Sequence, residues 1–442
     1  MVQRARFFSA LFLALFLSQS LTAQVVRSGP MVGYSEMREV MLWVQLWKSS
    51  EVYIRYLDVE TNEDFVTNTV RTEKKGAFTA HLLADRVKPG RKYKGELFVD
   101  GKKVNLKYPL EFQSQVLWQY RTDPPNFKFV TGSCAFINDP AYDRPGTPYG
   151  GGYEIFDHIA KQDADFMVWL GDNNYLREAD YGTRTGIMHR YSYARSKAEV
   201  QPLLGSMHHY AIWDDHDYGP NNSDRSYQHK DITLEAFQLF WANPSYGING
   251  NGGITSRFTW ADCDFFLLDN RYFRTPNDRV TGENTMLGKD QVEWLIDGLK
   301  MSRAPFKFVC IGGMVLSSLA EYENYSKTHP EERDYIMETI QKEKIKGVVF
   351  LDGDRHHTEL SYWKPDGGVA VYDLTCSPLT SGAYDTGDED NKYLVKGTTV
   401  GQRNFAVIEV TGADGERTLK MTLIDRENKV QWTREISEKE WE

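Results

Sequence analysis

The residues best suited to chemistry stand where apolar, strand-like segments end. Four such segments end in Gly132-Ser133-Cys134, Gly171-Asp172-Asn173-Asn174-Tyr175, Trp213-Asp214-Asp215-His216-Asp217 and Gly353-Asp354-Arg355-His356. Carboxylates, a phenolate, imidazoles and one thiolate suit a hard, highly charged cation such as ferric iron, together with a second divalent ion that prefers oxygen ligands. Because the carboxyl ends of strands in open α/β layers line one crevice, we expect these side chains to form a single site.

Two of these motifs also have plainer explanations. Asp172 after a glycine could be a helix cap or a turn residue. Tyr175, three residues further on, changes this interpretation, because a tyrosine beside a carboxylate can bind ferric iron while Asp172 bridges two ions. Cys134 could equally be a buried, small apolar residue or a ligand, and the residues alone leave this open.

The segment 213–217 crowds three carboxylates around His216. This arrangement is costly in a folded protein unless a cation offsets the repulsion. An exposed acidic loop is one alternative, and a glycosidase-like carboxylate pair is another, although the latter leaves Tyr175 and His356 unexplained.

Asp354 and His356 alternate along the chain, so an extended backbone would point both to one side, as two ligands of one ion require. His357 would then face the opposite side, where it could orient a neighbour by hydrogen bonding.

Composition and missing motifs exclude several functions. A net charge of −10 from 52 Lys and Arg against 62 Asp and Glu argues against general nucleic-acid binding, and we expect no specific nucleic-acid partner. With 41% apolar and 26% charged residues, the chain is too balanced for disorder. P-loop, G-x-S-x-G, H-E-x-x-H and G-x-G-x-x-G motifs are missing from the sequence.

The first 23 residues have the pattern of a signal peptide. Arg4 and Arg6 precede the apolar run 7–17, which is too short to span a bilayer, and a polar, small-residue stretch follows it. We therefore expect export to the periplasm or the extracellular space, with an uncleaved N-terminal anchor as the alternative. No later run reaches membrane-spanning length, so the mature chain is predicted to be soluble.

The four cysteines are too few and too widely spaced to build a disulfide framework. Cys263 and Cys310 lie in apolar, strand-like runs and are predicted to be buried, inert thiols, with one disulfide left open as an alternative.

The pattern of apolar residues changes near residue 122. Residues 39–112 alternate with period two, and Asp100-Gly101 predicts a tight hairpin turn, so residues 24–122 are interpreted as a small antiparallel β-sandwich domain. A proline-bearing stretch at 122–125 suits a domain junction.

Residues 123–442 alternate short strands with amphipathic helices, which predicts layered α/β architecture. Strands are expected at 127–130, 165–170, 210–213, 306–311, 347–351, 405–410, 418–425 and 430–436. Helices are expected at 153–162, 233–242, 287–299 and 331–344.

The sequence motifs of this chain resemble those of the PhoD-like alkaline phosphatase and phosphodiesterase family. Six motifs match in order over about residues 27–440: the four strand-end clusters above, Leu268-Asp269-x-Arg271, and Leu287-Gly288-x-x-Gln291-x-x-Trp294-Leu295. The Gly-Asp-x-x-Tyr element is also similar to that of purple acid phosphatases. The resemblance implies a calcineurin-like metallophosphoesterase core of two packed β-sheets flanked by helices, preceded by a β-sandwich.

The resemblance also implies a metal centre of Fe³⁺ and Ca²⁺, with the identity of the second metal left open. Cys134, Asp172, Tyr175 and His356 would surround the iron, and Asp172 would bridge to calcium. Asp215, Asn221 and Asp354 are the candidates for the calcium side. Arg271 would hold a phosphate oxygen, and its alternative is a structural ion pair with Asp269.

The predicted activity is hydrolysis of phosphoric esters, monoesters or diesters, on a small-molecule or polymer substrate. A metal-bound hydroxide or oxide would attack phosphorus in line, while the cations and Arg271 neutralise charge on the equatorial oxygens. His216 is the candidate for protonating the leaving group. The alternatives are a secreted binding or adhesion module with an inactive phosphatase-like domain, and a metallohydrolase that acts on a glycan or a phosphonate.

Overall fold

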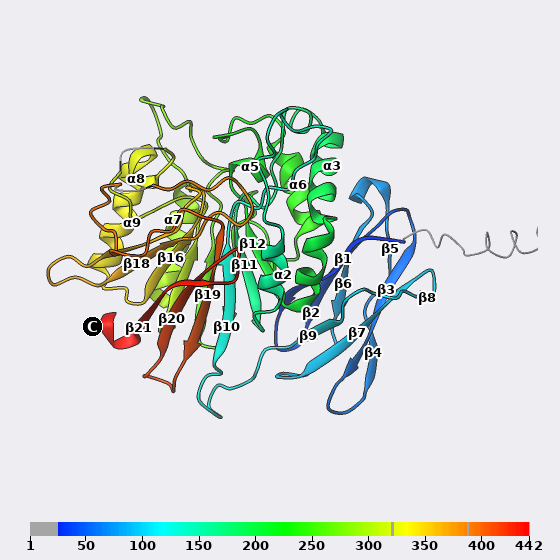
Figure 1. The fold of residues 1–442 in the computed structure, drawn as a ribbon. Helices are drawn as coiled ribbons and strands as arrows, with labels where there is room; N and C mark the ends of the chain where they lie inside the picture. Colours follow the sequence, from blue (N-terminus) through cyan, green and yellow to red (C-terminus); the bar gives the residue numbers. More distant parts are fainter. Residues whose placement is uncertain (1–24, 320–321, 387–388, 442) are drawn as a thin grey trace, which may run out of the picture.

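The computed structural model describes residues 25–319, 322–386 and 389–441 (Figure 1). Two large β-sheets pack face to face, and helices cover their outer faces. This arrangement confirms the predicted α/β core of two packed sheets flanked by helices. The predicted signal peptide lies outside the described residues.

The larger sheet has nine strands in the order β21-β20-β19-β10-β11-β12-β1-β2-β6. Its middle strands β10, β11 and β12 run parallel, so their carboxyl ends meet at one edge. In sheet order the strands span Val430–Ser437, Thr418–Asp425, Asn404–Thr411, Phe127–Gly132, Phe166–Leu170, His208–Ile212, Val26–Ser35, Val40–Leu46 and Thr79–Ala84.

The second sheet has six strands in the order β13-β14-β15-β16-β18-β17. Strands β14, β15, β16 and β18 are parallel. In sheet order the strands span Ser256–Trp260, Cys263–Leu267, Lys307–Cys310, Val348–Asp352, Val371–Thr375 and Glu359–Trp363.

An aromatic core joins the two sheets. Phe129 and Phe166 stack at 5.0 Å between ring centroids, and Phe265 of the opposite sheet meets each of them edge-on at 5.3 Å. Alternate residues of a strand point to opposite faces, so the apolar runs in these strands supply both this core and the contacts with the helices. The resulting scaffold holds the strand ends at fixed positions.

Helices cover both outer faces. Helices α7 (Lys289–Met301) and α9 (Pro330–Lys342) share a hydrophobic cluster with β15 and β16, and α2 (Glu154–Ala160), α3 (Arg184–Arg195) and α6 (Lys230–Phe240) pack on the larger sheet (Figure 1). The remaining helices are short: α4 (Gln201–Ser206), α5 (Asp215–Tyr218) and α8 (Tyr325–Thr328).

The N-terminal β-sandwich is present, but one of its sheets continues into the rest of the chain. Strand β1 pairs with β12 in parallel, with Val32 opposite His208, so β1, β2 and β6 extend the larger sheet. Their other face packs against a separate sheet made of β3 (Glu51–Asp58), β4 (Asp64–Val66), β5 (Val70–Arg71), β7 (Lys92–Val99), β8 (Lys102–Lys103) and β9 (Leu110–Gln113). The 24–122 boundary stays a prediction.

The predicted hairpin at Asp100-Gly101 is confirmed. Both residues have positive φ, 47° and 73°, and Val99 pairs with Lys102 across the turn. Positive φ at both central positions is the geometry that asparagine, aspartate and glycine tolerate in such turns.

The four cysteines are buried and unpaired, which confirms the prediction for Cys263 and Cys310. Among the described residues, no helix is both long enough and apolar enough to cross a membrane.

Candidate metal centre

A cavity of about 1030 Å³ opens where the central strands end. Asp172, Tyr175, His216, Asn221, Asp354 and His356 all line it. Strand β11 ends just before Asp172, and β16 ends just before Asp354. The strand-end argument therefore brings together residues that lie far apart in the sequence.

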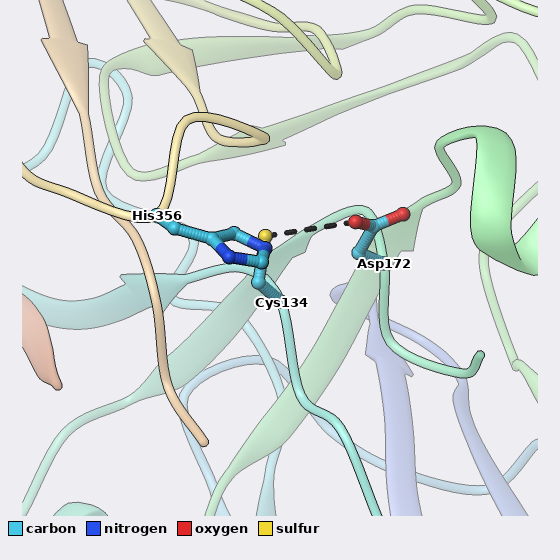
Figure 2. A group of neighbouring side chains, drawn as sticks. All are labelled: Cys134, Asp172 and His356. Carbon is cyan, nitrogen blue, oxygen red and sulfur yellow. Dashed lines mark hydrogen bonds between the residues drawn. The ribbon is translucent and has the colours of Figure 1, made fainter. Parts of the chain in front are cut away.

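Cys134, Asp172 and His356 form one group of potential ligands (Figure 2). One ligand atom from each lies within 4.8 Å of the others, and the Cys134 Sγ is 3.7 Å from Asp172 Oδ2. Burial, together with the charge of Asp172, raises the pKa of the Cys134 thiol well above its ordinary value. A thiolate at this position therefore requires a cation beside it.

Tyr175 lies against the same group. Its Oη is 3.3 Å from His356 Nε2 and accepts a hydrogen bond from Ser381 Oγ at 2.9 Å. Burial, followed by the charges of Asp172 and Cys134, raises the pKa of Tyr175 well above its ordinary value. The phenol is thus placed to become a phenolate ligand when a cation is bound.

Two further groups extend the site on the opposite side of Asp172. Asp172, Asp215 and His216 form one, and Asp214, Asp215 and Asp354 form the other, again with ligand atoms within 4.8 Å of one another. Asp172 and Asp215 each belong to two of the three groups. Asp172 is the one that the group containing the Cys134 thiol shares with a carboxylate group, so it is placed to bridge two ions. His216 donates its backbone N–H to Asp172 Oδ1 and Asp215 Oδ1, while its Nδ1 is buried without a hydrogen-bond partner.

Four of these residues have the left-handed backbone conformation. The φ angle is 60° at Cys134, 52° at Asp172, 66° at Asp354 and 55° at His356. Non-glycine residues adopt this conformation rarely, and such strain gathers at functional sites. The turns after β10, β11 and β16 therefore bend to aim their side chains at a common point.

The positive φ of Asp354 and His356 corrects one premise of the sequence analysis. The two residues were expected to alternate along an extended backbone, but they lie in a turn and belong to different ligand groups. His357 does point elsewhere: its Nδ1 lies 3.1 Å from the Arg355 carbonyl oxygen and its Nε2 lies 3.4 Å from Glu359 Oε2.

The glycines before the two aspartates are required by close packing. A Cβ on Gly171, whose φ is 93°, would lie 2.8 Å from the Asp214 Cβ, and a Cβ on Gly353 would overlap the Ser133 side chain. The Gly-Asp pairs of both motifs therefore reflect the close approach of the turns that carry the ligands.

Asn221 lines the cavity but is exposed, and its Nδ2 donates to Asn222 Oδ1 at 2.6 Å. The neighbouring Asn222 donates its backbone N–H to Asp215 Oδ2 at 2.7 Å. In this structure the loop thus supports Asp215 through the backbone of Asn222, and a ligand role for the Asn221 side chain stays a prediction.

Arg271 lies behind the cavity lining, with 1% of its surface exposed. Its Nε donates to Asp214 Oδ1 at 2.5 Å and its Nη2 to Glu323 Oε2 at 2.7 Å. Asp269, the partner considered in the alternative interpretation, instead accepts the backbone N–H of Arg271. Contact of Arg271 with a phosphate oxygen stays a prediction, and the observed geometry favours a positioning role.

Sequence reasoning missed several residues that complete the site. Tyr149 places its Oη 2.9 Å from His356 Nδ1, and Ser377 donates to the Cys134 Sγ at 3.2 Å. Arg177 lines the cavity, has a buried Nε without a hydrogen-bond partner, and forms no ion pair with any carboxylate of the described residues. Its position two residues after Tyr175, within the same turn, was the signal that could have identified it.

From the sequence alone, the stretch 139–152 and the loop 380–400 are predicted to form the cavity mouth, and this prediction is confirmed in part. Lining residues come from Asp143 to Tyr149, from Tyr384 to Thr386 and from Glu389. Leu176 to Glu178, Tyr181 and Tyr322 also line it and were not expected.

The residues fit bound cations. Burial, then the neighbouring carboxylates, raises the pKa of Asp172 and Asp354 well above the ordinary range. Burial would also raise the pKa of Asp215, but His216 and Arg271 outweigh it and lower that pKa. Buried carboxylates that face each other around a thiol, a phenol and an unpartnered imidazole nitrogen fit bound cations, which would offset the repulsion between the carboxylates.

Comparisons with known proteins agree with this geometry. The model of the PhoD-like phosphatase family matches residues 129–422, more than half of the chain. Alkaline phosphatase D of Bacillus subtilis (strain 168) is 23% identical over 369 residues, which cover 69% of this chain and 59% of the relative. The chain thus spans about three fifths of the length of that curated relative.

Solved structures match the fold. A structure of PhoD superposes with a TM-score of 0.75 at 16% identity, covering 95% of this chain and 94% of the other. Purple acid phosphatase PPD1 from yellow lupin (Lupinus luteus) seeds gives a TM-score of 0.68 at 11% identity, covering 92% of this chain and 74% of the other. The family match, which includes Cys134 to His356, confirms the resemblance drawn from the motifs, and the chain belongs to the PhoD-like phosphatase family.

Proposed function

We propose that this protein hydrolyses phosphoric esters at the buried base of the cavity. We call the candidate metal ligands that meet there the floor of the cavity. The observation that carries the proposal is the convergence of Cys134, Asp172, Tyr175, Asp215 and His356 on one buried site. Membership of the PhoD-like phosphatase family supports the reaction class.

We further propose that the site holds Fe³⁺ and a second, oxygen-preferring cation, with Ca²⁺ as the candidate. Cys134, Asp172, Tyr175 and His356 would hold the iron, and Asp172, Asp215, Asp354 and Asn221 would hold the second ion. Thiolate and phenolate suit ferric iron, while carboxylate and amide oxygens suit calcium. The bound cations would supply Lewis-acid charge and lower the pKa of a water molecule.

Side chains of the protein would position the water molecule, protonate the leaving group and bind the phosphate. The site would position water for in-line attack on phosphorus, and His216 would protonate the leaving oxygen, because its Nδ1 is buried with no hydrogen-bond partner. Arg177 would pair with a phosphate oxygen, because its guanidinium lines the cavity without a carboxylate partner among the described residues. Arg271 would hold Asp214 in place through the 2.5 Å hydrogen bond.

Export through an N-terminal signal peptide also stays part of the proposal. The pattern of residues 1–23 supports it: basic residues, a short apolar run and small residues. The buried, unpaired state of all four cysteines places no demand on the redox compartment.

An assay of aryl phosphate monoesters and diesters tests the proposed function. We expect the purified protein, supplied with Fe³⁺ and Ca²⁺, to hydrolyse at least one class and to lose that activity after chelation. The control is the Asp157→Asn variant, because Asp157 is a half-exposed residue of α2 that pairs with Lys161 and does not line the cavity. No turnover of either ester class by metal-replete protein would contradict the proposal and favour the binding-module alternative.

A further inference from the structure

The outer part of the cavity is lined by two kinds of side chain, arginines and tyrosines. We call Arg144 and Arg177 the cationic wall, and Tyr322 and Tyr384 the aromatic wall. Arg144 and Arg177 line it from the segments 143–149 and 176–181, which the ion pair between Arg144 and Glu178 joins. Tyr322 and Tyr384 belong to two other loops and expose ring surface to the cavity. The volume of about 1030 Å³ is far larger than a phosphate group needs, so the organic part of an ester has room to reach this aromatic wall.

Tyr384 continues a stack that begins at a predicted metal ligand. Its ring lies parallel to the His356 ring, with an interplanar angle of 7° and 5.5 Å between centroids. The Tyr149 Oη lies 3.2 Å from the Tyr384 Oη and so fixes the ring in this orientation. Tyr384 is nevertheless 54% exposed, so ring surface is left for a ligand one layer out from His356.

Tyr322 offers a second ring that is supported from one side. The Arg355 guanidinium lies 4.3 Å from the Tyr322 ring centroid, and Arg355 is itself held by two 2.9 Å hydrogen bonds to Glu389. Tyr322 is 62% exposed. Since Arg355 is the residue next to His356, both tyrosines are tied to the turn that carries this predicted ligand.

From these contacts we infer that the substrate is a phosphate ester whose organic group carries a planar ring, and that Tyr384 and Tyr322 bind this ring by stacking. This inference rests on the proposed phosphoesterase function. Planar rings stack on tyrosine faces in offset geometry, whereas a saturated ring of the same size gains only ordinary apolar contact. The two tyrosines are therefore specificity-determining residues that select the organic group without touching the reacting phosphorus.

The test compares two esters with the same leaving-group chemistry, 2-phenylethyl phosphate and 2-cyclohexylethyl phosphate, each as a monoester and as a methyl diester. Both release a primary alcohol, so a difference in kcat/KM reports recognition of the planar ring. We expect the parent protein to prefer the phenyl ester by about three- to tenfold, mainly through KM.

Variants that lack one tyrosine ring test which side chain causes the preference for the phenyl ester. Tyr384→Leu and Tyr322→Leu should each reduce the preference, and Tyr384→Phe should keep it. Tyr335→Leu is the matched control, because Tyr335 is a half-exposed residue of α9 that bonds Glu293 and does not line the cavity. A change in kcat for both esters alike in Tyr384→Leu would instead show that the variant disturbs His356.

The outcomes separate the inference from the proposed function. Hydrolysis of both esters at equal kcat/KM, or a preference that survives both leucine substitutions, would overturn the inference while the phosphoesterase proposal remains. Hydrolysis of neither ester, nor of the aryl esters above, would overturn both.

Discussion

The floor and the outer wall of the cavity are built in different ways. The floor consists of buried side chains in tight turns directly after β10, β11, β12 and β16, which are inner strands of the two packed sheets. The outer wall comes from longer loops with exposed side chains, including Tyr322 and Tyr384. The geometry of the ligands therefore depends on the rigid scaffold, whereas loops that can vary select the organic group of the substrate.

The largest expected effect is at the floor. Asp172→Asn removes a carboxylate charge from the residue that joins the group containing Cys134 and His356 to the group containing Asp215 and His216, so we expect both metal content and kcat to fall, with kcat reduced by about 10³-fold or more. Metal analysis and steady-state kinetics on the same preparation would measure this. Normal metal content with normal kcat would show that Asp172 does not bridge the ions.

His216→Ala tests the leaving-group side of the floor. We expect kcat for alkyl esters to fall about 10²-fold or more, and kcat for aryl esters to fall less, because a phenolic leaving group needs less protonation. The ratio of the two rates in the parent and in the variant is the measurement. Equal losses for both ester types would assign His216 another role, such as ligation beside Asp172 and Asp215.

Arg271→Met tests whether Arg271 has a structural role through its ion pairs with Asp214 and Glu323. Asp214 and Glu323 would lose their buried partner, so we expect the free energy of unfolding to fall by about 3–5 kcal/mol. Arg144→Met is the matched control, because Arg144 is 70% exposed in its pair with Glu178, and its loss should cost less than about 1 kcal/mol. Denaturant unfolding measures both. A stable Arg271→Met protein with a raised KM would instead support direct contact with phosphate.

Arg177→Gln tests the cationic wall and should have a smaller effect. We expect KM to rise about tenfold for every phosphate ester, whatever its organic group, because the proposed partner of Arg177 is the phosphate and not the ring. Arg144→Gln should change KM by less than about twofold, since its guanidinium is screened and already paired with Glu178. An effect confined to ring-bearing esters would place Arg177 with the aromatic wall.

The sequence predicted that the candidate ligands converge, because the carboxyl ends of parallel strands meet at one edge of a sheet, while their roles as ligands stay predictions. Cys134, Asp172, Tyr175, Asp215 and His356 were each identified from a short motif, and the structure brings them together. Most predicted strands and helices end within a few residues of the observed bounds, because apolar periodicity marks them directly. Helix α3 (Arg184–Arg195) was missed, since its buried side includes Arg190 and Ser192 and hides that periodicity.

Features that depend on distant partners could not be predicted in this way. The guanidinium of Arg271 is held by Asp214 and Glu323, and Glu323 is 52 residues away in the sequence. The pairing of β1 with β12 likewise joins residues far apart in the chain. Tyr322 lies in a loop without a periodic pattern, so only the folded structure places it on the same cavity as Tyr384.

The most direct test of the central claim is metal analysis of natively purified protein, together with its visible spectrum and that of Tyr175→Phe. We expect iron at about one per chain and a tyrosinate-to-iron absorption band in the parent, and loss of that band in the variant, because Tyr175 Oη lies beside His356 at the floor. If the protein bound no metal after metal supplementation, the proposed metal centre would be wrong.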